Sequence, residues 1–205
     1  MNPWVPPITL TGRIVRLEPL EQRHAPGLHG AAEPGLFQYT PQMPEVWSTA
    51  GFEKQIDTLN AMKDVVPFAM VLIETGAVIG RTTYMDINAS SRGLEIGRTW
   101  IARAYQGTLV NPEVKFLIMR HAFEQLAPTA IRVQYCTGGT NLHSQRAIAK
   151  LGAAREGVLR NHRVVPDGPD VNAPRIFRDT VVFSVIEQEW PAVKRGLVER
   201  IGWGA

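Results

Sequence analysis

The sequence is poor in the features that mark secreted, membrane-spanning and disulfide-stapled proteins. Cys136 is the only cysteine among the 205 residues, so no disulfide can form within the chain. No run reaches the roughly 20 apolar residues that a helix needs to span a bilayer. The apolar start, residues 1–10, is broken by three prolines and lacks the basic region of a signal peptide. We therefore expect a cytoplasmic protein, with Cys136 buried in a strand rather than acting as a nucleophile.

Strong charge of either sign and metal-ligand clusters are also missing. The net charge is +3, with 22 basic and 19 acidic side chains spread along the chain, which does not indicate a dedicated nucleic-acid binder. The five histidines show no spacing typical of a metal site, so we expect no metal. The densest basic group, residues 155–163, holds three arginines. It fits either a site for an anionic ligand such as a coenzyme phosphate or a solvated surface.

The sequence does contain a clear succession of apolar patterns. Alternating and continuous apolar runs predict about seven strands, and helical periodicity predicts about five helices. Asn111 and Pro112 are typical of a helix start, and Gly152 of a helix end. A meander followed by strand–helix units predicts a mixed sheet covered by helices, in one domain over residues 1–205. We expect strands at residues 15–17, 68–73, 78–87, 94–101, 131–137, 153–165 and 180–186, and helices at residues 24–32, 52–62, 112–126, 142–151 and 190–201.

The first segment suited to chemistry runs from residue 94 to residue 111. Its pattern is a strand, a tight loop with Gly107 and Thr108, and a helix start. Loop N–H groups and the helix dipole would favour an anion there, although an ordinary strand-to-helix connection explains the same pattern. Gly97 lies inside the strand, where glycine indicates a bulge or the close approach of a ligand.

The second segment follows the strand expected at residues 131–137. Asn141 and Ser144 lie three residues apart and share one side of the first turn of a helix. Helix capping is the simpler interpretation of this pair, because Asn and Ser cap helices in any context.

Taken in order, the two segments resemble the coenzyme A-binding motifs of the GNAT acetyltransferases. More narrowly, the chain resembles the RimJ/RimL-type branch, which is associated with acetylation of protein N-termini, especially those of ribosomal proteins. The resemblance implies a GNAT-type mixed, mostly antiparallel central sheet of about seven strands flanked by helices and splayed between strands 4 and 5. The matching stretches are residues 10–20, Glu95 to Gly97, Gln106 to Thr108 with Asn111, Asn141 with Ser144, and residues 150–152, 156–160, 183–186 and 189–190.

The resemblance implies acetyl-CoA as co-substrate and a set of residues that bind it. Leu109 and Asn111 stand where the family loop has small residues, so backbone approach to the phosphates is less free there. A family tyrosine proposed as general acid aligns with Ile148, and the RimL-type resemblance implies Ser144 in its place. The implied acetyl-CoA-binding residues are Ile96, Gly97, Arg98, Thr99, Trp100, Ile101, Gln106, Gly107, Thr108, Leu109, Val110, Asn111, Asn141 and Ser144.

The same resemblance places Glu95 on the strand beside the thioester. We expect the acceptor amine to attack directly, with Glu95 as the base and a backbone N–H near residues 97–99 for the developing oxyanion. A strand-face carboxylate paired with an arginine is an equal alternative for Glu95. Phe37, Tyr39 and Trp47 are expected to line the acceptor pocket, and packing of their loop onto the core is an equal alternative for them.

These residues lead us to expect an acetyl-CoA-dependent N-acetyltransferase that acts on a protein or peptide N-terminal α-amine. A small-molecule amine is the first alternative, which a deep closed pocket would favour over an open groove. A catalytically weak CoA-binding sensor is the second, and RNA or ribosome association through the mild positive charge is the third. The RimL-type resemblance also implies a homodimer. Residues 166–177 are expected to form a loop longer than is usual in the family.

Overall fold

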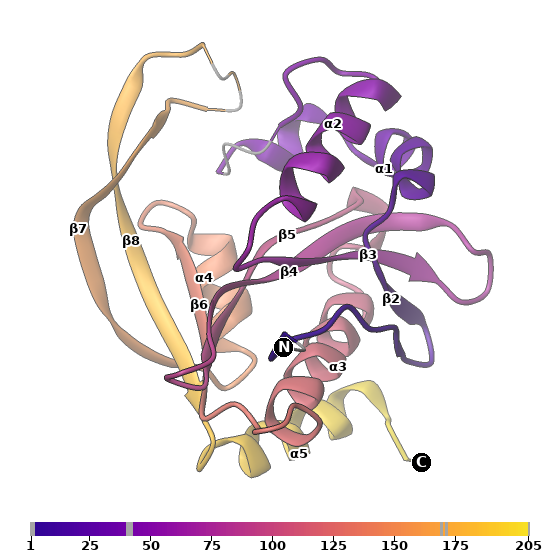
Figure 1. Ribbon diagram of the computed structural model, residues 1–205. Helices are drawn as coiled ribbons and strands as arrows, with labels where there is room; N and C mark the ends of the chain where they lie inside the picture. The colour runs from indigo at the N-terminus through magenta and orange to yellow at the C-terminus, as the bar shows by residue number, and fades with distance from the viewer. Residues whose placement is uncertain (1–2, 40–42, 169, 171, 205) are drawn as a thin grey trace.

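A computed structural model describes residues 3–39, 43–168, 170 and 172–204 (Figure 1). In this part of the chain, eight strands form one sheet in the order β1-β2-β3-β4-β5-β6-β8-β7. Neighbouring strands are antiparallel except β5 and β6, which are parallel. The expected mixed, mostly antiparallel sheet is confirmed, with the short β1 in addition. The strands are β1 (Leu10–Thr11), β2 (Val15–Pro19), β3 (Val66–Leu72), β4 (Val78–Asn88), β5 (Gly93–Ile101), β6 (Arg132–Gly138), β7 (Ala154–Pro166) and β8 (Arg175–Ile186).

Helices cover the sheet on two sides (Figure 1). Side chains of α1 and α2 share one buried cluster, and those of α3, α4 and α5 share the other. No helix in the described ranges is long and apolar enough to cross a membrane. The helices are α1 (Ala25–Ala31), α2 (Thr49–Asn60), α3 (Val110–Glu124), α4 (Leu142–Ala149) and α5 (Trp190–Ile201), with 3-10 turns at Gln22–His24, Pro34–Phe37 and Arg103–Tyr105.

β3 shows why the sheet needs cover on both faces. Phe68 and Met70 are buried in the cluster with α3 and α5, whereas the intervening Ala69 and Val71 are buried in the cluster with α1 and α2. A strand buried on both faces has a continuous apolar run rather than an alternating one. Each large apolar side chain removed from water contributes roughly 1.5–3 kcal/mol, so this run holds both helical layers onto the sheet.

The start of α3 differs from the sequence prediction. The helix was expected from residue 112 with Asn111 as its N-cap, but it begins at Val110 with Leu109 at the N-cap position. The hydroxyl of Thr108 accepts the N–H of Val110 at 3.3 Å, which gives the helix an earlier start. Asn111 as the N-cap was therefore wrong: it lies in the first turn, and the N-cap residue Leu109 makes no side-chain capping hydrogen bond.

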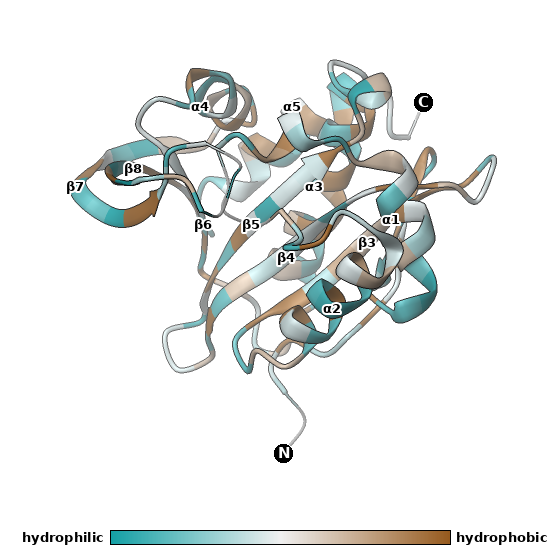
Figure 2. Cartoon of the chain, turned by 90° about the horizontal axis from the view of Figure 1, so that it is seen from above, coloured by the Kyte–Doolittle hydropathy of each residue, from teal (hydrophilic) through white to brown (hydrophobic). Residues whose placement is uncertain are grey.

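The β7–β8 hairpin differs from the prediction as well. Residues 166–177 were expected as a long loop, but β7 continues to Pro166 and β8 already begins at Arg175. The two ends pair, with Pro166 opposite Arg175. The hairpin extends beyond the core and curves past it (Figure 1), and hydrophobic and hydrophilic segments alternate along it (Figure 2). Its distal half exposes Val164 and Phe177, which are 60% and 72% accessible.

Candidate active site

The parallel strands β5 and β6 part after a short stretch of pairing. Residues 93–95 of β5 pair with residues 132–134 of β6. Beyond this point β5 stays paired with β4 up to Ile101, and β6 stays paired with β8 up to Gly138. One edge of each strand therefore has backbone N–H and C=O groups that lack a neighbouring strand and face a gap. The predicted splay between strands 4 and 5 is confirmed; these strands are β5 and β6 here because the short β1 adds one to the numbering.

β5 bulges where the gap begins. Its register with β4 shifts so that two residues of β5, Arg98 and Thr99, face one residue of β4. Arg98 has a φ of 50°, a left-handed value that is uncommon for this residue type. The hydroxyl of Thr83 donates to the C=O of Gly97 at 3.1 Å, and Arg81 Nη1 donates to the C=O of Arg98 at 3.2 Å. Side chains of β4 thus fix the bulge that the glycine predicted.

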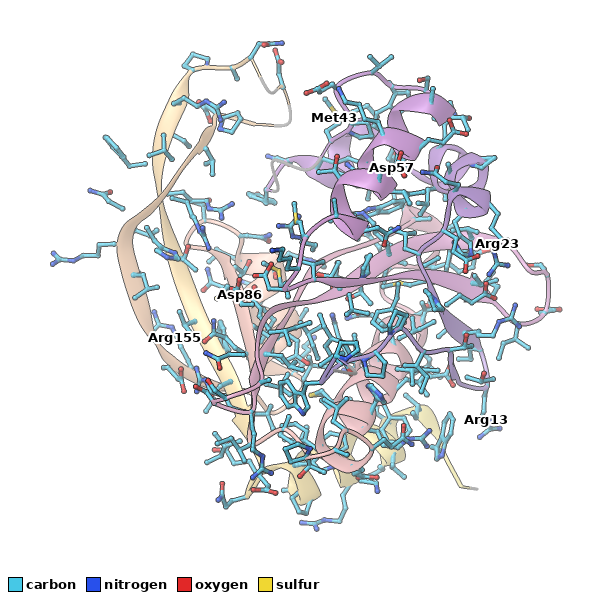
Figure 3. All side chains as sticks on the ribbon, viewed as in Figure 1. Arg13, Arg23, Met43, Asp57, Asp86 and Arg155 are labelled. Atoms are coloured by element: carbon cyan, nitrogen blue, oxygen red, sulfur yellow. The ribbon has the colours of Figure 1, made fainter. Side chains whose placement is uncertain are left out.

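Glu95 lies at the point where the strands part. Its side chain is 6% exposed, and Oε2 accepts a hydrogen bond from Gln134 Nε2 at 3.3 Å. Burial raises the pKa of Glu95; hydrogen bonds from Cys136 and Gln134 oppose the rise, and the charge of Asp86, labelled in Figure 3, adds to it. The charge of Arg163 also lowers this pKa, so an arginine does act on the carboxyl, although burial outweighs it. A carboxyl whose pKa is raised suits a general base near neutral pH.

Two neighbours define the surroundings of Glu95. Burial and the charge of Glu95 raise the pKa of the Cys136 thiol to about 12, so this thiol stays protonated near neutral pH and is no nucleophile. Gly97 leaves room for the carboxyl: a Cβ added there would lie 2.6 Å from Met85 Sδ and 3.0 Å from Glu95 Oε1. A side chain at this position would therefore displace Met85 first and then crowd the carboxyl of Glu95.

The loop between β5 and α3 presents its amides to solvent. Gly107 has a φ of 75°, a conformation that a Cβ disfavours. Gln106 Nε2 donates to the C=O of Ile101 at 3.0 Å, and the hydroxyl of Thr108 donates to the C=O of Tyr105 at 2.7 Å. The N–H groups of residues 107–109 have no acceptor within the described chain. Unbonded amides at the start of a helix of 15 residues suit an anion.

Asn141 and Ser144 lie at the start of α4, after β6. The side-chain oxygen of Asn141 accepts the N–H of Ser144 at 3.0 Å, so the capping interpretation is confirmed. The hydroxyl of Ser144 is half-buried and makes no hydrogen bond with any described residue. Ile148, which aligns with the family tyrosine, is buried in the core. Ser144 therefore keeps a hydroxyl available for a ligand, whereas Asn141 uses its oxygen on the helix.

The three aromatic residues expected in an acceptor pocket differ in exposure. Phe37 is fully buried and packs against Trp47 and Trp100, so it supports the core and does not itself line a pocket. Trp47 is 37% exposed and Tyr39 is 45% exposed. Arg178 of β8 donates to the C=O of Tyr39 at 3.0 Å. The loop that carries these aromatics thus contacts the β7–β8 hairpin.

A cavity of about 300 Å³ opens beside the bulge of β5. Arg81 and Arg98 reach it from the sheet, and α2 with the loop before it forms the rest. Burial and the charge of Arg98 lower the pKa of Arg81 to about 9. Burial also lowers the pKa of Arg98, although Asp64, Asp86 and Glu95 oppose the shift. The remaining lining residues are Met43, Pro44, Glu45, Val46, Gly51, Lys54, Gln55, Thr58, Leu59 and Met62.

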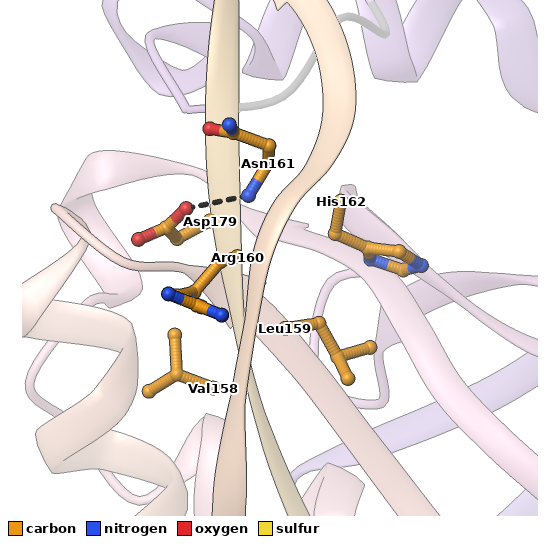
Figure 4. A pocket seen from close by; sticks show the side chains of 6 residues that line it. All are labelled: Val158, Leu159, Arg160, Asn161, His162 and Asp179. Carbon is orange, nitrogen blue, oxygen red and sulfur yellow. Dashed lines mark hydrogen bonds between the residues drawn. The ribbon is translucent and has the colours of Figure 1, made fainter.

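A larger and more open hollow lies on the β7–β8 hairpin (Figure 4). It measures about 840 Å³ and is lined by residues 158–162 and Asp179. There β7 bulges, and the N–H of Asn161 donates to Asp179 Oδ1 at 2.7 Å (Figure 4). None of the lining residues belongs to β5, β6 or the loop before α3. We therefore treat this hollow as separate from the site around Glu95.

The structure also brings Lys115 to the gap, a residue that was not among those predicted from the sequence. Lys115 lies on α3, is 6% exposed, and donates to the hydroxyl of Thr99 at 2.9 Å. Its ammonium also lies 5.6 Å from the ring centroid of Tyr135 on β6. One feature of the sequence could have indicated Lys115: it and Glu113 are charged residues in a stretch of helix that is otherwise largely apolar.

Residues 15–154 match the family model of the acetyltransferase (GNAT) domain. The chain belongs to the GNAT acetyltransferase family. This GNAT protein is therefore an enzyme, an acyltransferase, and the family's acetyl donor is acetyl-CoA.

Solved structures resemble this GNAT chain over almost its whole length. A T. thermophilus protein is 37% identical, with a TM-score of 0.84 and coverage of 97% of this chain and 99% of that one. A GCN5-related N-acetyltransferase from Brucella melitensis is 30% identical, with a TM-score of 0.85 and coverage of 97% and 87%. Mycobacterium smegmatis RimJ in complex with CoA-disulfide is 20% identical, with a TM-score of 0.79 and coverage of 98% and 97%, which shows a shared fold. A comparison with curated proteins gave no match.

The residues around the gap of this GNAT enzyme fit acetyl-CoA. Its diphosphate needs N–H donors, and the loop before α3 offers those of residues 107–109. Its pantetheine arm carries amides that pair with strand edges, and β5 and β6 each present one. Two buried polar atoms, Tyr135 Oη and Trp100 Nε1, have no partner within the described residues. Buried polar groups of this kind are typical of sites that bind a polar ligand or water.

Proposed function

We propose that this GNAT enzyme transfers acetyl from acetyl-CoA to the N-terminal α-amine of a protein or peptide. The observation that carries the proposal is the buried carboxyl of Glu95 at the apex of the gap between β5 and β6. Direct attack needs a neutral amine, and an α-amine has a pKa of about 8 against about 10.4 for lysine. Deprotonating a lysine near neutrality therefore costs about 3 kcal/mol more. A single carboxyl with a raised pKa is therefore better suited as a base to the α-amine, which is the easier of the two amines to deprotonate.

The donor would lie along the gap, with its diphosphate at the start of α3. The unbonded amides of residues 107–109 support this placement, as does the left-handed turn at Gly107. Leu109, one of the two departures from the small-residue pattern, is 44% exposed and so does not fill the loop. The proposed contacts with acetyl-CoA are residues 96–101 along β5, residues 106–111 in the loop and first turn, and Asn141 and Ser144 at the start of α4.

Acetyl-CoA supplies an activated thioester, and the protein positions the groups that act on it. The amine nitrogen bonds to the carbonyl carbon while the carbon–sulfur bond breaks. Glu95 takes the amine proton, directly or through one water. A backbone N–H of residues 97–99 stabilises the carbonyl oxygen as it gains negative charge. The hydroxyl of Ser144, which has no other described partner, hydrogen-bonds to the departing sulfur.

A small-molecule amine is the second candidate, and the cavity beside Arg98 favours it. At about 300 Å³, this cavity is at the lower end of the range of small-molecule sites. For a peptide, the same cavity would hold the side chain of the first residue. The backbone of the peptide would then follow the surface between Trp47 and the β7–β8 hairpin, which Arg178 and Tyr39 connect.

The test is a thiol-release assay with acetyl-CoA and a panel of acceptors. The panel holds short peptides with free N-termini, the same peptides with blocked N-termini and a lysine, and small amines including polyamines. We expect release with free N-termini and at least tenfold less with the blocked peptides. Turnover of small amines alone would select the second candidate, and no turnover with any amine would contradict both.

The role of Glu95 is tested in the same assay against pH. Because burial raises the pKa of Glu95, activity should fall on acidification at a pH above the ordinary carboxyl value of 4.5. Glu95→Gln should lose about two orders of magnitude or more of kcat, together with this acidic limb. Asp86→Asn is the matched control: it should keep kcat and move the acidic limb to lower pH, because the charge of Asp86 raises the pKa of Glu95. Equal activity of Glu95→Gln and Asp86→Asn would remove Glu95 as the base.

We also propose that the enzyme forms a homodimer through the distal part of the β7–β8 hairpin. Val164 and Phe177 lie opposite each other on one face of the hairpin and are exposed there, and apolar groups gathered on one surface are typical of protein contacts. Light scattering of the purified protein should give twice the chain mass, and Phe177→Ser should give the monomer mass. A wild-type monomer across a concentration series would contradict the dimer.

A further inference from the structure

Lys115 lies across the two strands that part. It sits in the second turn of α3, and its ammonium donates to the hydroxyl of Thr99, on β5 beyond the last pair with β6. On the other side it lies 5.6 Å from the ring centroid of Tyr135, on β6 just beyond the same pair. The side chain is 6% exposed. Lys115 therefore approaches the gap from the α3 side, at the start of its open part.

Glu113 and Lys115, two charged residues near the start of α3, differ in how fully they are hydrogen-bonded. Glu113 is 1% exposed, and its carboxylate accepts three backbone N–H groups, from residues 13, 14 and 15, at 2.7 to 2.9 Å. Lys115 has three N–H donors, and one of them is used, on the neutral hydroxyl of Thr99. In the ranges that the structure describes, no carboxylate lies within ion-pair distance of Lys115 and burial is the sole influence on its pKa. Hydrogen bonds within the fold therefore account for the buried carboxylate of Glu113. Two N–H donors of Lys115 have no acceptor among the described residues and are available to a ligand.

We propose that Lys115 is a positioning residue that hydrogen-bonds to a carbonyl oxygen of the acyl-pantetheine arm in the gap between β5 and β6. The inference rests on the proposed placement of acetyl-CoA in that gap. An ammonium with unused donors suits the amide and thioester carbonyls of the arm, and charge-assisted hydrogen bonds are the stronger kind. The buried hydroxyl of Tyr135, which lacks a described partner, lies on the same wall of the gap.

A ligand bound in this way makes CoA affinity depend on the protonation of Lys115. Burial lowers the pKa of Lys115 to about 7 in the protein alone. A carbonyl that accepts from the ammonium favours the charged form, so binding raises this pKa and the protein takes up a proton. On β5 the group facing Lys115 is Thr99, which does not titrate. On β6 and β4, burial raises the pKa of Tyr135 and of Tyr84, so both stay neutral below pH 9.

The first measurement needs no variant. Calorimetry of CoA binding at pH 8, in two buffers of different ionisation enthalpy, gives the number of protons taken up. We expect the wild-type protein to take up most of one proton and its affinity for CoA to fall as pH rises from 7 to 9. No uptake at pH 8, with CoA bound, would overturn the role of Lys115.

The second measurement compares Lys115→Met with Lys194→Met, which removes a surface lysine of α5 as the matched loss of charge. Lys115→Met should bind CoA about tenfold more weakly at pH 6, without proton uptake at pH 8. Adenosine 3′,5′-diphosphate lacks the pantetheine arm, so its affinity should stay within about twofold in all three proteins. Equal CoA affinity and equal proton uptake in wild type and Lys115→Met would remove this inference alone. A wild-type protein that does not bind CoA would remove the proposed function itself.

Discussion

Replacing Lys115 by methionine should stabilise the protein at low pH. Burial lowers the pKa of this lysine from 10.5 to about 7. Each unit corresponds to about 1.4 kcal/mol, so keeping the ammonium in the folded state costs about 5 kcal/mol below pH 7. In either charge state the lysine side chain also makes the hydrogen bond to Thr99 and packs on Tyr135, contacts of about 2–3 kcal/mol that a methionine loses. A methionine of similar length removes both the buried charge and the contacts with Thr99 and Tyr135. The free energy of unfolding should therefore rise by roughly 2–3 kcal/mol at pH 6.

The pH dependence distinguishes this reasoning from a simple packing effect. Between pH 7 and 10.5 the unfolded chain holds the proton of Lys115 and the folded chain does not, so the wild type gains stability as pH rises. The advantage of Lys115→Met should therefore shrink above pH 7 and disappear by about pH 9. Urea unfolding of both proteins at pH 6, 7.5 and 9 measures the difference. A difference that is constant with pH, or a less stable methionine variant at pH 6, would refute the argument.

Two further substitutions test the scaffold and the site. Glu113→Gln leaves one acceptor oxygen for the three N–H groups of residues 13–15, of which that of Val15 is buried. It should lower the free energy of unfolding by about 2–4 kcal/mol and speed amide exchange at those residues, as urea unfolding and hydrogen exchange will show. Gly97→Ala places a Cβ 2.6 Å from Met85 Sδ and 3.0 Å from Glu95 Oε1, so it should shift both side chains. We expect kcat to fall about tenfold or more while the Kd for CoA changes less than about threefold, as kinetics and calorimetry will show. A stable Glu113→Gln or a fully active Gly97→Ala would show that these contacts are dispensable.

The order of elements was predictable because each has its own local pattern. The buried run at residues 66–72 and the periodic apolar residues of α5 need no information from elsewhere in the chain. The hairpin was predictable only in part. The Pro-, Asp- and Asn-rich stretch at residues 166–174 indicates a turn, but the extension of β8 back to Arg175 depends on pairing with β7. Strand pairing of this kind is tertiary and leaves little trace in one strand alone.

The backbone conformation of the site was easier to predict from the sequence than the contacts of its side chains. The bulge at residues 97–99 and the loop at residues 106–111 were indicated by Gly97 and Gly107, which are needed for local reasons. The contact of Glu95 with Gln134 depends on the register of two parallel strands that lie far apart in the sequence. Lys115 was missed for the same reason, because a charged residue on a helix gives no sign that a parted sheet lies against it.

The central claim is that the gap between β5 and β6 holds acetyl-CoA, and hydrogen exchange with and without CoA tests it most directly. The account predicts slower exchange on CoA binding for the amides of residues 96–101 along β5 and residues 107–110 at the start of α3. The hollow at residues 158–162 of β7 should be unaffected. CoA that binds and protects the hairpin amides, while those of residues 96–110 exchange as before, would contradict the account.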